Sequence, residues 1–410
     1  MSFFTKNTFR VFIPFAFGYF LSYLFRTINA VAAPNLSTDL SLNPSQLGLL
    51  TSAYFIAFAL SQLPLGILLD RFGPRIMESF LLIFASLGAF IFAKSHTLLG
   101  VITGRVFIGF GVSACLMAAF KAYVIWIPEK YWTRINGFQM AAGGLGALAS
   151  TIPIELSLQI INWRTLFFIL SFLTFCAAIT IFIFVPEKKN TKEKKSFSSQ
   201  INGIKHIFTS KVFWQIAPLA TMSQAGFFAI QGLWAGPWLR DVAMIDRTQA
   251  ANVLSYTAIS MICGFVCHGF IAEKLTKKGI SLLSTSVIGI SFSIASLFLI
   301  TFKIFFPPSL LWILFGFFGT TGILVYPALS TIFPKSLSGR VTTGLNLIVF
   351  LSAFCLQWAI GAIINLWGTI SNLHYNPLGY KAGFALILVL QIGALIWYFF
   401  ARKDFRRNGL

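Results

Sequence analysis

The chain has 410 residues, of which 57% are hydrophobic and only 10% are charged, and its mean hydropathy is +0.81. A soluble domain averages about 25% charged residues, so a soluble protein of this composition would expose large apolar patches to water. The composition therefore excludes an ordinary soluble protein and indicates one embedded in a lipid bilayer. The net charge of +20 does not indicate nucleic-acid binding, because the basic residues fall in short clusters between apolar runs.

Twelve apolar runs are long enough to cross a bilayer, which takes roughly 20 helical residues. We therefore predict an all-α integral membrane protein whose helices form two pseudo-symmetric six-helix bundles. The first run is interpreted as an uncleaved span, because it is too long for the apolar part of a signal peptide. The predicted spans are residues 9–33, 47–69, 76–94, 98–125, 135–159, 164–185, 210–236, 248–271, 280–302, 308–333, 341–367 and 382–401.

The first span contains Arg26 and Asn29. A charge at the bilayer centre costs about 2.5–3.5 kcal/mol on insertion scales, so an intramembrane arginine indicates a function. Arg26 lies eight residues before Pro34, about 12 Å from the outer end at the α-helical rise. A side chain facing lipid could not comfortably reach the surface from that depth, so we expect Arg26 to face protein or water.

The loop between the second and third spans holds a compact charged motif, in which each residue type has a physical role. Glycines permit a close helix approach and a tight turn, and an aspartate can accept hydrogen bonds from a helix N-terminus or a basic partner. We expect the loop to act as a conformational latch. The latch residues are Gly66, Asp70, Arg71, Gly73 and Arg75, with a degenerate second copy at Gly269, Glu273 and Lys274.

Arg105 lies in the fourth span at about the same depth as Arg26, which suggests one positively charged cavity wall suited to a carboxylate or phosphate. A purely structural bond to backbone carbonyls is the alternative for Arg105. Lys121, near the inner end of the same span, is expected to reach the headgroups with its long side chain.

Glu155 is the one acid placed deep within a span and outside the signature loops. It is a coupling candidate that would carry a proton if burial raised its pKa. A fixed salt bridge and a position at headgroup level are the alternatives.

A polar, lysine-rich stretch then divides the spans six and six. We predict an N-terminal bundle over residues 1–186, a flexible cytoplasmic linker over 187–209 and a C-terminal bundle over 210–410. Shifting the first part by 203 residues brings Ala33-Pro34 onto Gly236-Pro237, as expected for an internal duplication around a central site.

Polar and amphipathic side chains also occur in the seventh and eleventh spans. Each could face a substrate or form a bond between helices. With Arg26, Asn29 and Arg105, the candidates for substrate binding are Gln231, Trp234, Asn346 and Gln357.

Lysine and arginine set the orientation of the chain. With both termini in the cytoplasm, 22 of the 31 basic residues lie in cytoplasmic segments and six lie outside. The positive-inside rule therefore predicts cytoplasmic termini.

The loop motif Gly66-Ile-Leu-Leu-Asp70-Arg71-Phe-Gly73-Pro-Arg75 resembles the signature of the major facilitator superfamily of transporters. Arg105, followed by Gly109 and Gly111, resembles its second signature. The antiporter signature of the fifth span is incomplete, because its Gly-Pro is absent, and this favours symport or uniport. The chain is also similar to the organic-anion symporters of this superfamily, through a span-one arginine near an asparagine. That group usually has carboxylates where this chain has Phe25 and Val112.

These features together predict a secondary transporter working by alternating access, which moves a small organic anion in symport with a proton. A proton-driven efflux pump for amphipathic compounds is the alternative, and a transporter-like membrane sensor is a third. We expect a monomer in a bacterial inner membrane, with no cofactor and no bound metal. An enzyme is not expected, because no nucleophile–base pair, metal cluster or phosphate-binding loop is found.

Overall fold

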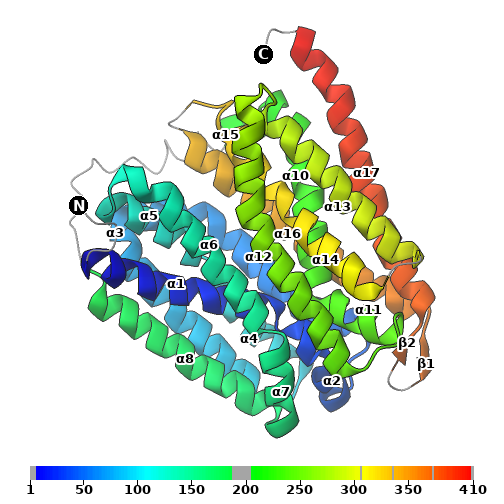
Figure 1. The fold of residues 1–410 in the computed structure, drawn as a ribbon. Helices are drawn as coiled ribbons and strands as arrows, with labels where there is room; N and C mark the ends of the chain where they lie inside the picture. The colour runs from blue at the N-terminus through cyan, green and yellow to red at the C-terminus, as the bar shows by residue number, and fades with distance from the viewer. Residues whose placement is uncertain (1–5, 187–204, 305–306, 335–336, 372–373, 408–410) are drawn as a thin grey trace.

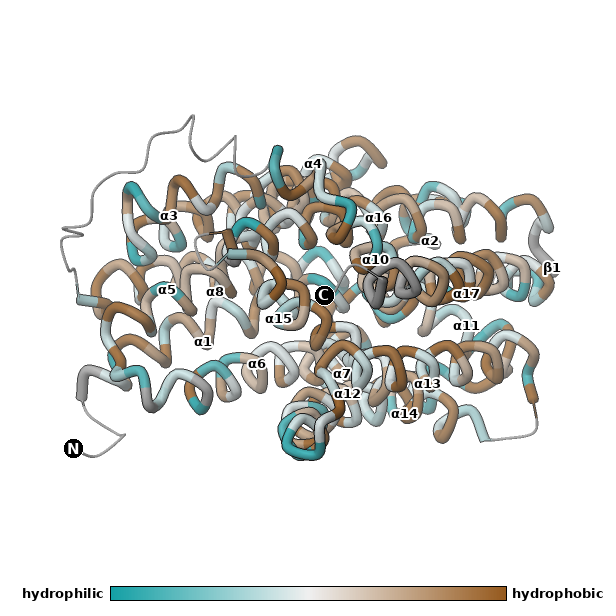
Figure 2. The backbone as a smooth tube through the Cα atoms, turned by 90° about the horizontal axis from the view of Figure 1, so that it is seen from above, coloured by the Kyte–Doolittle hydropathy of each residue, from teal (hydrophilic) through white to brown (hydrophobic). Residues whose placement is uncertain are grey.

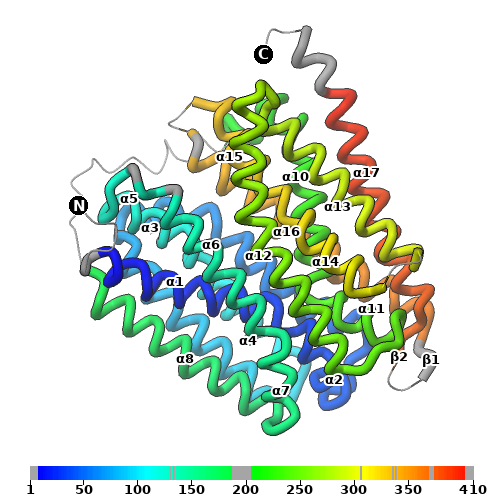
Figure 3. Tube along the Cα trace, viewed as in Figure 1, coloured from blue at the N-terminus to red at the C-terminus, as the bar shows by residue number. Residues whose placement is uncertain are grey.

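The computed structural model describes residues 6–186, 205–304, 307–334, 337–371 and 374–407. Nearly all of these residues are helical, and the chain can be followed from blue to red in Figure 3. We call residues 6–186 the first half and residues 205–407 the second half. Most of the predicted linker, residues 187–204, lies outside the described residues.

The first half consists of helices whose ends lie close to the predicted spans (Figure 1). They are α1 (Lys6–Thr27), α2 (Asn29–Leu40), α3 (Pro44–Lys94), α4 (Leu98–Gly111), α5 (Cys115–Trp126), η1 (Glu129–Tyr131), α6 (Trp132–Ala149), α7 (Ile152–Ile160) and α8 (Trp163–Phe184).

The second half adds further helices and a short hairpin. They are α10 (Lys211–Ala229), the π-helical turn η2 (Ile230–Trp234), α11 (Ala235–Asp241), α12 (Arg247–Lys277), α13 (Leu282–Phe302), α14 (Pro308–Gly319), η3 (Thr320–Leu324), α15 (Val325–Ser330), α16 (Ser338–Leu366), β1 (Thr369–Ser371), β2 (His374–Tyr375) and α17 (Pro377–Arg407).

Among the described residues, ten helical stretches are long and apolar enough to cross a membrane. The 51-residue α3 covers two of the predicted spans. Gly73 separates them, because its φ of 79° is non-helical and suits a residue without a Cβ atom. Residues 210–236 were predicted as one span, but the structure divides them among α10, η2 and α11.

Other predicted spans are interrupted as well. The first breaks at Ile28 and the fifth at Ser150–Thr151. The hydroxyl groups of Thr27 and Ser150 lie 2.7 Å apart, so the two breaks face each other inside the first half. Interrupted helices free backbone groups for other partners, a feature that membrane proteins tolerate only where protein or a cavity surrounds it.

The long helices carry apolar residues along most of their length (Figure 2). Large apolar side chains remain exposed on the lipid-facing surface, such as Phe172 and Phe182 on α8 and Phe270 on α12. This exposure agrees with a multi-pass membrane protein, in which lipid rather than water surrounds the helices.

The molecule has two opposite ends, here called the hairpin end and the linker end. The hairpin end carries α2, α7, α11 and the β-hairpin, which gather at the lower right of Figure 1. We call the end that carries the Gly73 turn of α3, the last turn of α8 and the first turn of α10 the linker end.

Several close contacts between the halves lie toward the hairpin end. A Cβ atom added to Gly236 of α11 would overlap the carbonyl oxygen of Ala30 in α2. One added to Gly361 of α16 would overlap the carbonyl oxygen of Pro44 at the start of α3. Nearby, the hydroxyl groups of Thr151 and Ser255 lie 2.6 Å apart. The two halves are therefore in close backbone contact at this end.

Candidate functional site

Arg26 occupies the last turn of α1, directly before the break at Ile28, and only 5% of its surface is exposed. Its guanidinium carbon lies within 6.0 Å of five aromatic ring centroids contributed by both halves. The distances are 4.4 Å to Tyr23, 6.0 Å to Tyr54 and 5.5 Å to Phe58 in the first half, and 5.2 Å to both Phe228 and Phe350 in the second half. We call these five rings the aromatic cage.

The cage closes across the junction of the two halves. The ring centroids of Phe58 and Phe350 lie 4.2 Å apart, and Phe228 stacks on Phe350 at 5.4 Å. Ring faces attract a cation within about 6 Å, by about 2 kcal/mol when both are desolvated. The cage therefore offsets part of the cost of burying Arg26, but it supplies no negative charge.

None of the ion pairs between described residues includes Arg26, and its Nε atom is buried without a hydrogen-bond partner. The expectation that this side chain faces protein rather than lipid is confirmed by its burial. Its role as a ligand of the substrate stays a prediction.

Arg105 lies close to Arg26 but has different surroundings. It is fully buried in the first half, and its Nη1 donates a 2.8 Å hydrogen bond to the carbonyl oxygen of Phe25. Its Nε and Nη2 atoms have no partner. The structure therefore places Arg105 behind α1, where it holds the backbone of the residue before Arg26.

The remaining candidates line the same junction at several depths. Asn29 donates from Nδ2 to the Thr51 hydroxyl at 2.9 Å, and its Oδ1 atom is buried without a partner. Gln357 donates to the carbonyl oxygen of Ala229 at 3.3 Å, and its Oε1 atom is likewise unpartnered. Both amides thus keep a buried acceptor atom that a donor group of a solute could use.

The other three candidates differ in their exposure to the junction. Gln231 donates to the sulfur of Met261 at 3.3 Å, within the second half. Trp234 is fully buried and donates to the carbonyl oxygen of Gln357 at 2.9 Å, so it packs the closed hairpin end. Asn346 is half-buried, one helical turn before Phe350 on the same face of α16.

Glu155 does not contact Arg26. It lies in the first turn of α7, is 4% exposed, and accepts a 3.3 Å hydrogen bond from Arg247 at the start of α12. The same Nη2 atom of Arg247 donates to Asn35 at 2.7 Å. Of the alternatives for Glu155, the structure shows a salt bridge, and its partner belongs to the other half.

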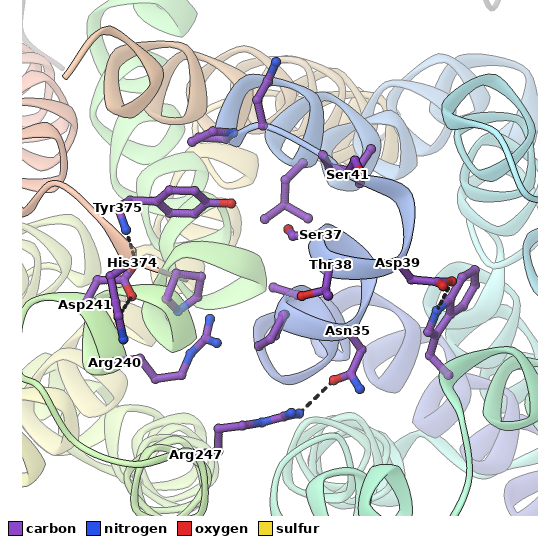
Figure 4. Close-up of a pocket in the computed structure, with 18 of the residues that line it drawn as sticks. Asn35, Ser37, Thr38, Asp39, Ser41, Arg240, Asp241, Arg247, His374 and Tyr375 are labelled. Carbon is purple, nitrogen blue, oxygen red and sulfur yellow. Dashed lines mark hydrogen bonds and ion pairs between the residues drawn. The ribbon is translucent and has the colours of Figure 1, made fainter. Parts of the chain in front are cut away.

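A cavity of about 1510 Å³ opens at the hairpin end above these residues. Figure 4 shows α2 residues on one side of it, and Arg240, Asp241, His374 and Tyr375 on the other. Asp39 pairs there with Arg164, and this hydrogen bond holds the pKa of the Asp39 carboxyl below its usual value. Asp241 accepts hydrogen bonds from the Tyr380 hydroxyl at 2.6 Å and from His374 at 2.9 Å.

The signature loop lies at the linker end. Asp70 accepts a 2.5 Å hydrogen bond from Lys121 of α5, which also donates to the carbonyl oxygen of Leu69. Lys121 was expected to reach the headgroups, and the structure shows its ammonium paired with this aspartate, whose side chain is exposed. The pair lies within the first half, so in this conformation Asp70 makes a latch between α3 and α5 and not between the halves.

The other loop residues make fewer contacts. Arg75 donates to the carbonyl oxygen of Phe182 at 2.8 Å, whereas Arg71 is exposed beside Phe72. Glu273 pairs with Lys277 at 2.7 Å on the surface of α12, next to the exposed Lys274. A Cβ atom added to Gly66 or Gly269 would meet nothing within 4 Å, so the close approach expected at Gly66 does not occur in this conformation.

Two features could not be identified from the sequence. The rings of the cage are separated along the chain by up to hundreds of residues. Only the spacing of Tyr23 and Arg26, which places both on one helical face, indicated that a ring contacts this arginine. Glu78 was assigned only to the beginning of a span. It is fully buried, and neither of its carboxylate oxygens has a hydrogen-bond partner.

Comparison with known proteins places these features in context. The sequence model of the Major Facilitator Superfamily matches residues 15–354. A probable L-galactonate transporter of Escherichia coli (strain K12) is 22% identical over 280 residues, covering 65% of this chain and 61% of that protein. The hexuronate transporter of Bacillus subtilis (strain 168) is 22% identical over 266 residues, covering 63% of each. The chain thus matches less than two thirds of the length of these relatives.

Solved structures show the same fold. A bacterial homolog of the human lysosomal transporter Spinster, in an inward-facing and unoccupied conformation, matches with a TM-score of 0.75 at 17% identity. The match covers 98% of this chain and 99% of that one. A D-xylose-proton symporter matches with a TM-score of 0.71 at 14% identity, over 94% of this chain and 97% of that one.

Proposed function

This chain belongs to the major facilitator superfamily, and from that premise we propose that it is a secondary transporter that moves a small organic anion by alternating access. The observation that carries the choice of an anion is Arg26. It is a buried cation without an acid partner among the described ion pairs, and it lies where the two halves meet.

The chemistry of the cage supports a carboxylate as the group that is bound. A guanidinium presents parallel N–H donors that match the two oxygens of a carboxylate, and such bidentate hydrogen bonds are about twice as strong as neutral ones. The free acceptor atoms of Asn29 and Gln357 suit hydroxyl groups of the same solute. The curated relatives are named for transport of L-galactonate and hexuronate, which are hydroxylated carboxylates.

The organisation around the site follows from the same proposal. We take residues 1–186 and 210–410 as two six-helix bundles that rock about the cage, with twelve spans in all and residues 187–209 as a cytoplasmic linker. The distribution of basic residues supports cytoplasmic termini and a hairpin end that faces outside, and we take the protein to be a monomer in a bacterial inner membrane. An impermeant thiol reagent should then label Met244→Cys on intact cells and spare Ser198→Cys, and the opposite pattern would reject this topology.

Proton coupling is part of the proposal, with Glu155 as the coupling candidate. A buried carboxylate that loses its basic partner when the halves separate would favour its neutral, protonated form. The cost of leaving an unpaired charge out of water is several kcal/mol. Proton uptake would therefore accompany opening at the hairpin end.

Uptake into proteoliposomes tests the proposal. Labelled hexuronate or L-galactonate should accumulate, and more so when the proton concentration is higher at the hairpin side than at the linker side. Arg26→Lys keeps the charge but loses the planar fork, so the KM should rise about tenfold or more if one bidentate bond of about 1.5–3 kcal/mol is weakened. Arg164→Lys, at an arginine outside the cage, is the matched control.

The result that would reject the ligand role is specific. If Arg26 served only structure, Arg26→Lys would lower thermal stability and leave the KM of the folded fraction unchanged. Glu155→Gln should not rescue Arg26→Ala, because Glu155 pairs with Arg247 and not with Arg26. Export of amphipathic cations by the same vesicles, with no uptake of carboxylates, would instead favour the efflux function, which the aromatic rings also suit.

A further inference from the structure

One ion pair joins the two halves across the hairpin end. Arg247 begins α12 in the second half, and its Nη2 atom lies 3.3 Å from a carboxylate oxygen of Glu155 in the first half. Asn35 of α2 accepts a second hydrogen bond from the same nitrogen. Glu155 is almost fully buried, whereas the side chain of Arg247 is 41% exposed to the cavity. The pair therefore has one member facing solution and one facing protein.

The charges around this pair leave positive charge in excess. Arg240 of α11 lines the same small cavity as Glu155 and Arg247, and none of the ion pairs between described residues includes it. The cavity acids Asp39 and Asp241 have their own partners on α8, β2 and α17. Two arginines and one carboxylate thus line this small cavity, and both arginines also line the large one.

The remaining cavity acid does not change this balance. Asp246 is bound to its own helix, where its side chain accepts the backbone N–H of Gln249 as an N-cap. Figure 4 shows Arg240 and Arg247 approaching the middle of the cavity from the second half, opposite the polar residues of α2. An anion entering from the hairpin end would meet these two guanidinium groups before it reached the closed contact at Gly236.

We propose that Arg247 is a cation shared between two partners. While the hairpin end is closed, Arg247 pairs with Glu155. When this end opens, Glu155 takes up a proton, and Arg247 binds the carboxylate of an incoming organic anion with Arg240 beside it. This inference rests on the proposed function and adds to it an outer anion site that is separate from Arg26. The proton passes from the solution at the hairpin end to a carboxylate oxygen of Glu155. The carboxylate of the anion replaces that oxygen at the guanidinium of Arg247.

Charge balance makes the two ligands depend on each other. The closed pair is neutral, and the open state with a protonated Glu155 and an anion on Arg247 is neutral as well. A proton alone leaves a second arginine unpaired, and an anion alone leaves the buried Glu155 carboxylate without its partner, which is costly. Opening is therefore favoured by proton and anion together more than by the sum of either alone.

The cavity provides a matched control. Asp39 and Arg164 form an ion pair in the same cavity, but α2 and α8 both belong to the first half. Breaking this pair changes the charge of the cavity equally without releasing a contact between the halves. It separates an effect of opening from an effect of cavity charge.

Thiol labelling measures the opening directly. Leu254 is buried beneath the pair of Glu155 and Arg247 and lines two small cavities there. In a chain whose five native cysteines are replaced, Leu254→Cys therefore reports whether a reagent can reach this position from the hairpin end. An impermeant maleimide is applied from the hairpin side, at neutral or mildly acidic pH, with or without D-glucuronate as the probe. Labelling should accelerate about tenfold with acid and glucuronate together, since a partly buried ion pair can bias a two-state equilibrium by that factor.

Variants decide the outcome. In Glu155→Gln, which keeps the shape of the side chain, glucuronate alone should accelerate labelling and the dependence on pH should disappear. Asp39→Asn should behave as the parent. Equal labelling of Glu155→Gln and the parent under all conditions, or the same change in Asp39→Asn, would overturn the proposal. Arg26→Lys should raise the KM of uptake and keep the labelling response. An unchanged KM in Arg26→Lys would therefore count against the central site and not against the outer one.

Discussion

The contact between Gly236 and the carbonyl oxygen of Ala30 allows the closed hairpin end to be tested with one methyl group. In Gly236→Ala the new Cβ atom would overlap that oxygen, whereas an ordinary contact needs about 3.4 Å. Helices α11 and α2 must therefore separate before the alanine fits. Overpacking of this kind costs about 1–3 kcal/mol. Because only the closed conformation bears this cost, the ratio of closed to open molecules should fall by a factor of roughly 5 to 150.

Disulfide formation across the halves measures this ratio. The hydroxyl oxygens of Thr151 and Ser255 lie 2.6 Å apart, so Thr151→Cys and Ser255→Cys should cross-link readily in a chain without its native cysteines. Adding Gly236→Ala should slow the cross-linking in proportion to the fall in the fraction of closed molecules, so the rate reports the shift of the equilibrium.

Gly269→Ala is the control, because a Cβ atom there meets nothing within 4 Å. It introduces the same methyl group on a helix of the same half. Unchanged cross-linking in Gly236→Ala, or equal slowing in Gly269→Ala, would refute the reasoning that this glycine contact sets the closed state.

Three further predictions concern single side chains. Asp70→Asn should reduce the transport rate and leave membrane insertion intact, because it removes the ion pair with Lys121, and full transport at normal expression would show that the loop only orients the chain. Arg164 lowers the pKa of Asp39, so the pair stabilises the fold above the usual carboxyl pKa and loses this effect as pH falls. Asp39→Asn should therefore remove this part of the pH dependence of Tm. The stabilisation amounts to less than about 1 kcal/mol, because the pair is half-exposed. Glu78→Gln should keep or raise Tm, since no described ion pair needs the charge of Glu78, and a marked drop would reveal a cationic partner.

The positions of the helices could be predicted from the sequence, because roughly 20 apolar residues in a row have few other uses. The interruption at Ile28 and the π-helical turn at 230–234 could not, since hydropathy reports the environment of a side chain and not the hydrogen bonding of its backbone. The depth of Arg26 and Arg105 was also predictable, and the hydrogen bond from Arg105 to Phe25 agrees with it. The particular side chains that surround them could not be predicted, because a modest rotation of a helix decides which side chain meets the junction.

Contacts between residues that lie far apart in the sequence could not be predicted. Glu155 and Arg247 are 92 positions apart, and each had several plausible surroundings when only the order of residues was known. The same holds for the rings from the second half that cover Arg26. Pairing of this kind depends on how the two halves dock, which no local pattern of one sequence encodes.

Because both halves contribute rings to the aromatic cage, the affinity for the solute should depend on how the halves are arranged. Phe228 and Phe350 can move away with the second half, while Tyr23, Tyr54 and Phe58 stay with Arg26. A guanidinium that loses two ring faces gains water in their place, and water competes with any bound carboxylate. The dissociation constant of the solute should therefore change as the halves move, although every residue that binds it stays the same. Such a protein would retain its cargo while the cage is shut and release it by hydration once the rings part.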